Sequence, residues 1–299
     1  MSRNQSINLQ RLASYASLSV ALTLVAVKIW AWYATGSVSL LSSLVDSFLD
    51  VMASAITVIA IRISLVPADA EHRFGHGKAE GLAALAQSII IAGSAVYVFS
   101  EAVTRLLNPK AVTAPEIGMG VMALSVALTL ALVAFQQYVV RETQSMAINA
   151  DAAHYKTDLL INLGVAFTLP IAAWTDFVII DPIVGIIIAL YILRATYDIA
   201  TDALDVLLDR ELPTADRNKI YSIAMQHKDV KGFHDLRTRF GGNQYFIQFH
   251  LELEPQMTLL ETHRILDDVE DQVKAAYPNS DIIVHADPVG FEEQRDDFS

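Results

Sequence analysis

Six long apolar stretches constrain the fold of this chain more than any other feature. A helix needs about 20 residues, at ~1.5 Å per residue, to cross the hydrocarbon core of a bilayer. Hydrophobic residues make up 53% of the 299 residues and charged residues only 18%, and the mean hydropathy is +0.39. We therefore expect a polytopic α-helical membrane protein with six transmembrane helices. The six predicted spans are approximately Leu12–Thr35, Ser39–Leu65, Gly81–Leu106, Ile117–Val140, Met146–Ala173 and Ile183–Leu207.

The composition changes near Asp209. Residues 209–299 hold 10 Lys/Arg against 18 Asp/Glu, a net charge of −8 within a total of −12. The hydrophobic pattern there predicts helix, strand, strand, helix and strand, with Gly241, Gly242 and Asn243 as a hairpin turn. We expect a transmembrane domain over 1–208, a cytoplasmic metal-binding α+β domain over 209–290 and an acidic, disordered tail over 291–299. The five predicted elements are Pro213–Gln226, Phe233–Phe240, Gln244–Leu253, Leu259–Ala276 and Asp281–Ala286.

The distribution of positive charges among the loops predicts the orientation. Loops that retain Lys and Arg generally stay in the cytoplasm. Arg105 and Lys110 lie on one side of the six spans, whereas seven such residues lie on the other side, so both termini are expected in the cytoplasm. The seven are Arg3, Arg11, Arg62, Arg73, Lys78, Arg141 and Arg210.

Composition excludes cysteine chemistry and argues against one class of partner. The chain has no cysteine, so it forms no disulfide and no thiolate metal site. The net charge of −12 argues against nucleic acid as a partner.

Four ionisable residues lie within two of the predicted spans. Asp46 and Asp50 in the second span, and His154 and Asp158 in the fifth, are each spaced i, i+4, which places each pair on one helix face. Counted from the cytoplasmic flanks of these antiparallel spans, all four lie at a similar depth of roughly 20–28 Å. Charges at such depth are costly and usually functional. Three carboxylates and one imidazole predict a tetrahedral site that suits Zn²⁺.

Other polar residues in the spans have simpler interpretations. Ser, Thr and Asn side chains line the same faces, either along a hydrated pathway or as contacts between helices. Lys28 and Glu101 are single charges, which we interpret as snorkelling or helix-end residues.

Two further groups of possible metal ligands lie outside the spans. Asp69, His72 and His76, spaced i, i+3, i+7 in the loop after the second span, would form a three-ligand site if that loop turned helically; the alternative is an exposed polar loop. Histidines and one carboxylate on the predicted tail strands and second helix would form a site for one or two metals. This second group consists of His234, His250, His263, His285 and Asp287.

Three motifs together resemble the cation diffusion facilitator family, most closely its bacterial zinc transporters. They are the string Ser-Leu-Leu-Ser-Ser-Leu-Val-Asp46-Ser-Phe-Leu-Asp50, the string Phe74-Gly-His76-Gly-Lys78-Ala-Glu80 and the string Asp151-Ala-Ala-His154-Tyr-Lys-Thr-Asp158. The resemblance extends to Asp287 and so covers nearly the whole chain.

The resemblance implies a secondary active transporter rather than an enzyme. It implies a homodimer in the bacterial cytoplasmic (inner) membrane, with a metallochaperone-like tail, that exports Zn²⁺, and also Cd²⁺ or Fe²⁺, in exchange for protons. By resemblance, the span residues form the transport site, the loop residues a second site and the tail residues a binuclear cytoplasmic site. A salt bridge between Lys78 and Asp209 is implied near the dimer interface.

Two rival functions are less consistent with the sequence. An intramembrane metalloprotease would need a motif such as His-Glu-x-x-His, which this sequence lacks. A metal-sensing receptor, with spans that serve only as anchors, would not account for matched carboxylates inside the membrane.

Overall fold

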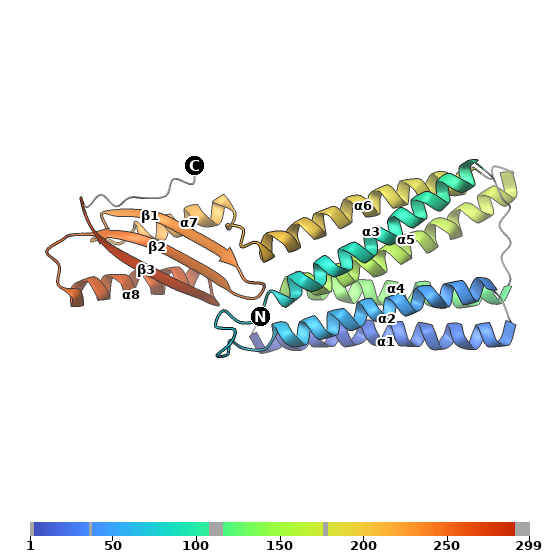
Figure 1. The fold of residues 1–299 in the computed structure, drawn as a ribbon, viewed down its shortest axis with the longest axis horizontal. Helices are drawn as coiled ribbons and strands as arrows, with labels where there is room; N and C mark the ends of the chain where they lie inside the picture. The colour runs from blue at the N-terminus through green and yellow to red at the C-terminus, as the bar shows by residue number, and fades with distance from the viewer. Residues whose placement is uncertain (1–2, 36–37, 108–115, 176–178, 291–299) are drawn as a thin grey trace. The chain divides into compact units, whose positions relative to one another are not determined.

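The computed structural model describes residues 3–35, 38–107, 116–175 and 179–290. The chain divides into two compact units, Met1–Leu204 and Asp205–Ser299, and each is described by itself below (Figure 1). The predicted acidic tail, 291–299, lies outside the described residues.

Each of the six predicted spans is an α-helix. Five of the helices contain a segment long and apolar enough to cross a membrane, counted over the described residues. The remaining one, α5, carries the three charged residues Asp151, Lys156 and Asp158 in its first half. The helices are α1 (Arg3–Thr35), α2 (Val38–Ser64), α3 (Ala79–Leu107), α4 (Glu116–Thr143), α5 (Met146–Thr175) and α6 (Ile180–Leu207).

Small residues bring the membrane helices together. Ala13, Ala60, Ala83 and Ala147 are buried in one cluster. Alanine lets helix backbones approach closely, which is a main source of association energy where lipid removes the hydrophobic driving force. The helix α5 contacts α2, α3 and α4, so polar residues on α5 face other helices.

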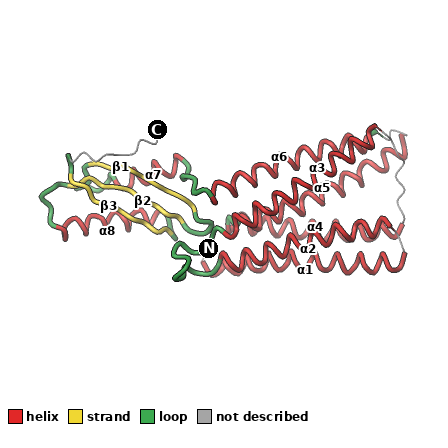
Figure 2. Tube along the Cα trace, viewed as in Figure 1, coloured by secondary structure: helices red, strands yellow, loops and turns green. Residues whose placement is uncertain are grey.

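The second unit is a three-stranded sheet with two helices, in the predicted order (Figure 2). The strand β2 is central, antiparallel to β1 and parallel to β3. The turn between β1 and β2 contains Gly242 with φ of 89°, a conformation that glycine adopts without strain. The elements are α7 (Thr214–Ala224), β1 (Gly232–Phe240), β2 (Tyr245–Leu253), α8 (Leu259–Ala276) and β3 (Ser280–Pro288).

Alternation along β2 separates a core face from a polar face. Phe249 and Leu251 are fully buried against a cluster that includes Val269 and Val273 of α8. Because successive strand residues point to opposite faces, His250 lies on the face away from this core. The polar face of the sheet therefore carries the candidate ligands that come from the strands.

Candidate metal-binding sites

The first site lies between α2 and α5. Ligand atoms of Asp50, His154 and Asp158 all lie within 4.8 Å of one another. The Nε2 atom of His154 is 3.1 Å from Oδ1 of Asp50, and the His154 residue is only 5% exposed. Oxygen and imidazole nitrogen donors at this spacing suit a divalent transition metal such as zinc. The structure thus brings together three of the four predicted span ligands.

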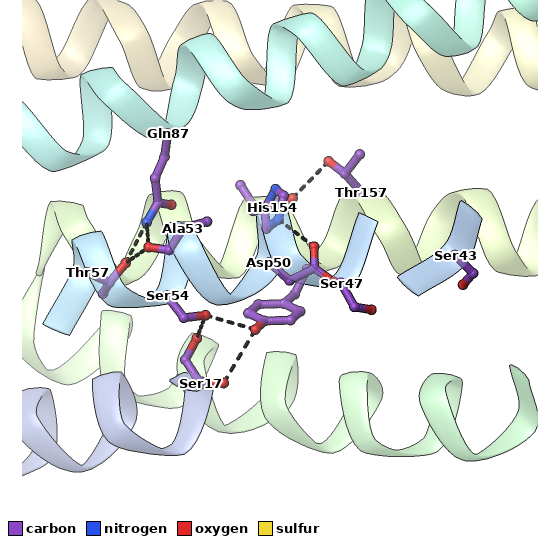
Figure 3. Close-up of polar contacts among 12 residues, drawn as sticks. Ser17, Ser43, Ser47, Asp50, Ala53, Ser54, Thr57, Gln87, His154 and Thr157 are labelled. Atoms are coloured by element: carbon purple, nitrogen blue, oxygen red, sulfur yellow. Dashed lines mark hydrogen bonds and ion pairs between the residues drawn. The ribbon is translucent and has the colours of Figure 1, made fainter. Parts of the chain in front are cut away.

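A buried hydroxyl network fixes α1, α2 and α5 beside this site (Figure 3). The Oγ atom of Ser54 lies 2.8 Å from Oγ of Ser17 and 2.9 Å from the hydroxyl of Tyr155. Tyr155 follows His154 directly on α5, so its hydroxyl holds this turn of the helix against α1 and α2. The network restricts the position of the His154 imidazole.

Two buried side-chain amides extend the hydrogen-bond network between the helices. Gln87 donates to the Thr57 hydroxyl at 2.5 Å and to the Ala53 carbonyl at 3.3 Å (Figure 3). Gln136 donates to Oδ2 of Asp151 at 2.6 Å, and Asp151 is fully buried. Some of the polar side chains that line these helix faces therefore make contacts between helices.

Asp46 lies outside the group formed by the other three span ligands. It is exposed on α2, one turn before Asp50, and among the described residues no group of ligand atoms within 4.8 Å of one another includes it. Its assignment as a fourth ligand stays a prediction.

One of the two single charges in the spans, Lys28, differs from the interpretation based on sequence. The ammonium of Lys28 does not simply extend to the helix end, because it donates to Oγ of Ser47 at 2.6 Å and to the Ser43 carbonyl at 3.1 Å. Glu101 accepts from Arg105 at 2.8 Å. A signal for Lys28 was present in the sequence, since an ammonium in an apolar span needs hydrogen-bond acceptors.

The loop between α2 and α3 gathers Asp69, His72 and His76. Their ligand atoms lie within 4.8 Å of one another, and both imidazoles have a nitrogen 3.5 Å from the Asp69 carboxylate. The expected helical turn is not formed. Instead, Oδ1 of Asp69 accepts from the backbone amides of Glu71 and His72, at 2.9 and 2.6 Å. The His72 amide, followed by the Glu71 amide, holds the pKa of Asp69 below its ordinary value.

In the tail, strand register places three histidines in one row. His234 pairs with His250 across β1 and β2, and His250 pairs with His285 across β2 and β3. Asp287, two residues after His285 on the same face, lies 2.8 Å from His250, 3.1 Å from His234 and 3.2 Å from His285. The three histidines surround the buried carboxylate of Asp287.

The donor set of this cluster fits a metal ion. His234 is mostly buried, and neither of its ring nitrogens makes a hydrogen bond, although Glu252 approaches to 3.3 Å. Burial alone would raise the pKa of Asp287, but the His250 hydrogen bond and the three imidazoles lower it overall. Gly232 leaves space for Glu252, because a Cβ there would lie 2.5 Å from Oε2 of Glu252.

His263 is not part of this row. It lies on α8, its side chain is 66% exposed, and it approaches Asp267 at 3.5 Å. Its assignment as a tail ligand stays a prediction. The Lys78–Asp209 salt bridge would join the two units and also stays a prediction; Asp209 accepts from Arg239 at 3.0 Å.

Comparisons with known proteins cover both units. Residues 14–208 match the family model described as cation efflux transmembrane domain, and residues 212–289 match the cation efflux protein, cytoplasmic domain. The chain is 44% identical over 278 residues to the cation-efflux pump FieF of Pectobacterium atrosepticum. The matched region covers 93% of this chain and 92% of that protein. It is 43% identical over 276 residues to FieF of Salmonella arizonae, with 92% of each covered. A metal-bound C-terminal domain of the CzcD transporter from Thermotoga maritima is 21% identical, with a TM-score of 0.26, over 26% of this chain and 93% of that one.

Proposed function

Because this chain belongs to the cation diffusion facilitator family of membrane transporters, we propose that it exports Zn²⁺ from the bacterial cytoplasm in exchange for protons. The observation that carries this proposal is the convergence of Asp50, His154 and Asp158 within 4.8 Å between two apolar helices. Cd²⁺ and Fe²⁺ are further candidate substrates, since oxygen and imidazole donors also accept them. Asp46 would supply a fourth ligand when the helices move.

Proton coupling follows from competition at the same atoms. A metal binds only the deprotonated ligands. The imidazole of His154 and the carboxylate of Asp50, 3.1 Å apart, can hold a proton between them when no metal is bound. Acid on the release side would therefore displace the metal.

The assembly proposed is a homodimer with both termini in the cytoplasm. The tail cluster around Asp287 would hold structural zinc, with His263 as an additional ligand, and so reduce repulsion between two acidic tails. The loop group of Asp69, His72 and His76 would sense cytoplasmic zinc and link its binding to the spans and the tail.

Zinc-65 uptake into proteoliposomes tests the proposal. Wild-type vesicles should accumulate zinc, and Asp50→Ala vesicles should not, because a direct ligand is lost. Asp198→Asn is the matched control, since Asp198 is an exposed acid on α6 that pairs with Arg194 at 2.9 Å. Undiminished uptake by folded Asp50→Ala protein would overturn the assignment of the transport site.

A further inference from the structure

Lys28 places a positive charge beside the transport site without occupying it. Its Nζ atom donates to Oγ of Ser47 at 2.6 Å and to the carbonyl of Ser43 at 3.1 Å. Ser47 is completely buried and lies three residues before Asp50, on the same face of α2. Both acceptors are neutral oxygens, so these hydrogen bonds fix the ammonium but leave carboxylate oxygens available for a metal ion.

The hydrogen bond to Ser47 holds the Lys28 ammonium beside the acidic face of α2. Ser47 follows Asp46 directly and lies one turn before Asp50, and Asp158 of α5 faces Asp50. Two of these acids are members of the compact group on α2 and α5. A positive charge that interacts with all three will oppose the binding of another cation among them.

The net formal charge of the site, counted with Lys28, indicates which ion charge the site balances. With Asp46 included as the predicted fourth ligand, the three carboxylates ionised and His154 neutral, the site carries −3, and Lys28 reduces this to −2. A divalent ion then brings the site to neutrality, whereas a monovalent ion leaves −1 and a trivalent ion leaves +1. A net charge that remains in a low-dielectric environment is costly.

We propose that Lys28 is an internal counter-ion of the transport site, which matches the site to divalent cations and weakens their binding enough for release. This inference rests on the proposed function of the site. Lys28 is a positioning and specificity residue in this view. Its two hydrogen bonds go to Ser43 and Ser47, and neither of these is a proposed metal ligand.

The test is equilibrium binding of Zn²⁺ to the full-length protein in detergent, measured by calorimetry. His72, His76, His234 and His250 are replaced by alanine in all samples, so that heat from the loop and tail groups is removed. In this background Lys28→Met should bind Zn²⁺ at least about tenfold more tightly, because repulsion of the ion is lost. Lys28→Arg, which keeps the charge, should stay within about twofold.

Two controls separate charge from structure. Ser47→Ala removes one hydrogen bond to Lys28 but keeps every charge, so it should not reproduce the gain in affinity that Lys28→Met shows. In Lys28→Met, the affinity for Tb³⁺, followed by its luminescence, should rise by a larger factor than that for Zn²⁺, because the lost repulsion scales with ion charge. Lys28→Gln replaces Lys28→Met if the methionine variant elutes as an aggregate.

The outcomes distinguish this inference from the proposed function. Equal or weaker Zn²⁺ binding in folded Lys28→Met or Lys28→Gln would overturn the counter-ion role, as would an equal gain in Ser47→Ala. Failure of the parent protein to bind Zn²⁺, or unchanged binding in Asp50→Ala, would instead overturn the transport site itself.

Discussion

Among single residues, Asp50 and Asp46 are neighbours on one helix with different environments. Asp50 contacts His154 at 3.1 Å, whereas Asp46 is exposed and outside the compact group. We predict that Asp46→Ala weakens Zn²⁺ binding at the membrane site, while Asp50→Ala abolishes it, because three ligands remain together only in the first variant. Calorimetry on proteins without loop and tail histidines measures this difference. Equal losses in the two variants would show that Asp46 is as direct a ligand as Asp50.

The same residues show what a sequence can predict. The convergence of Asp50, His154 and Asp158 follows from helix periodicity and from depth counted along antiparallel spans. The environments of Asp46 and Lys28 do not, because they depend on how α1 rotates against α2. The Lys28 ammonium could reach Ser47 only once that packing was known.

At the scale of elements, the start of α8 is stabilised by a capping box. Thr258 accepts from the Glu261 amide, and the Glu261 carboxylate accepts from the Thr258 amide at 2.9 Å. The Thr258 backbone and then its hydroxyl lower the pKa of Glu261. We predict that Thr258→Ala lowers the free energy of unfolding of the tail by ~1 kcal/mol. Urea unfolding of 205–299 measures it, and Thr258→Ser, which keeps the hydroxyl, should show little change; a loss as large in the serine variant would contradict the capping role.

The pKa of Glu261 also predicts a pH dependence. Because its folded value is depressed, its stabilising contribution is complete above the unfolded value and is lost as pH falls through the folded value. Glu261→Gln should therefore be less stable than wild type near neutral pH, with a difference that shrinks on acidification below the ordinary Glu range. Urea unfolding midpoints of the wild-type and Glu261→Gln tails, measured across that pH range, show whether the two stabilities converge. A constant difference would show that the charge of Glu261 contributes nothing.

Sheet register organises the tail cluster, and this part was only partly predictable. The hairpin turn and the alternation of β2 place His234 and His250 opposite each other. The parallel pairing of β3 with β2, which adds His285 to the row, depends on the crossover through α8. The position of exposed His263 on α8 likewise followed from packing and not from its spacing in the sequence.

The cluster predicts that zinc stabilises the tail. Zn²⁺ should raise the melting temperature of the isolated segment Asp209–Ser299, and His234→Ala combined with His250→Ala should remove this effect, because two of the ligands around Asp287 are lost. Thermal melting with and without zinc, together with metal stoichiometry, provides the measurement. A wild-type tail that melts at the same temperature in both conditions would exclude a structural metal.

For the whole molecule, the proposed proton coupling would connect the membrane site to a gradient across the bilayer. We predict that acid on the release side accelerates zinc transport in proteoliposomes, because protons compete with zinc for Asp50 and His154. In His154→Asp the pH at which zinc transport is half-maximal should move to a lower value, since the imidazole is replaced by a more acidic group. Flux that ignores an imposed gradient would indicate a channel.

The central claim is that a divalent metal ion binds between α2 and α5. Anomalous diffraction at the zinc absorption edge, from crystals of the zinc-loaded full-length protein, tests it most directly. We expect an anomalous peak about 2.0–2.2 Å from ligand atoms of Asp50, His154 and Asp158, and its loss in Asp50→Ala crystals that retain the tail peak. Peaks at the loop and tail groups alone, at saturating zinc, would contradict the claim.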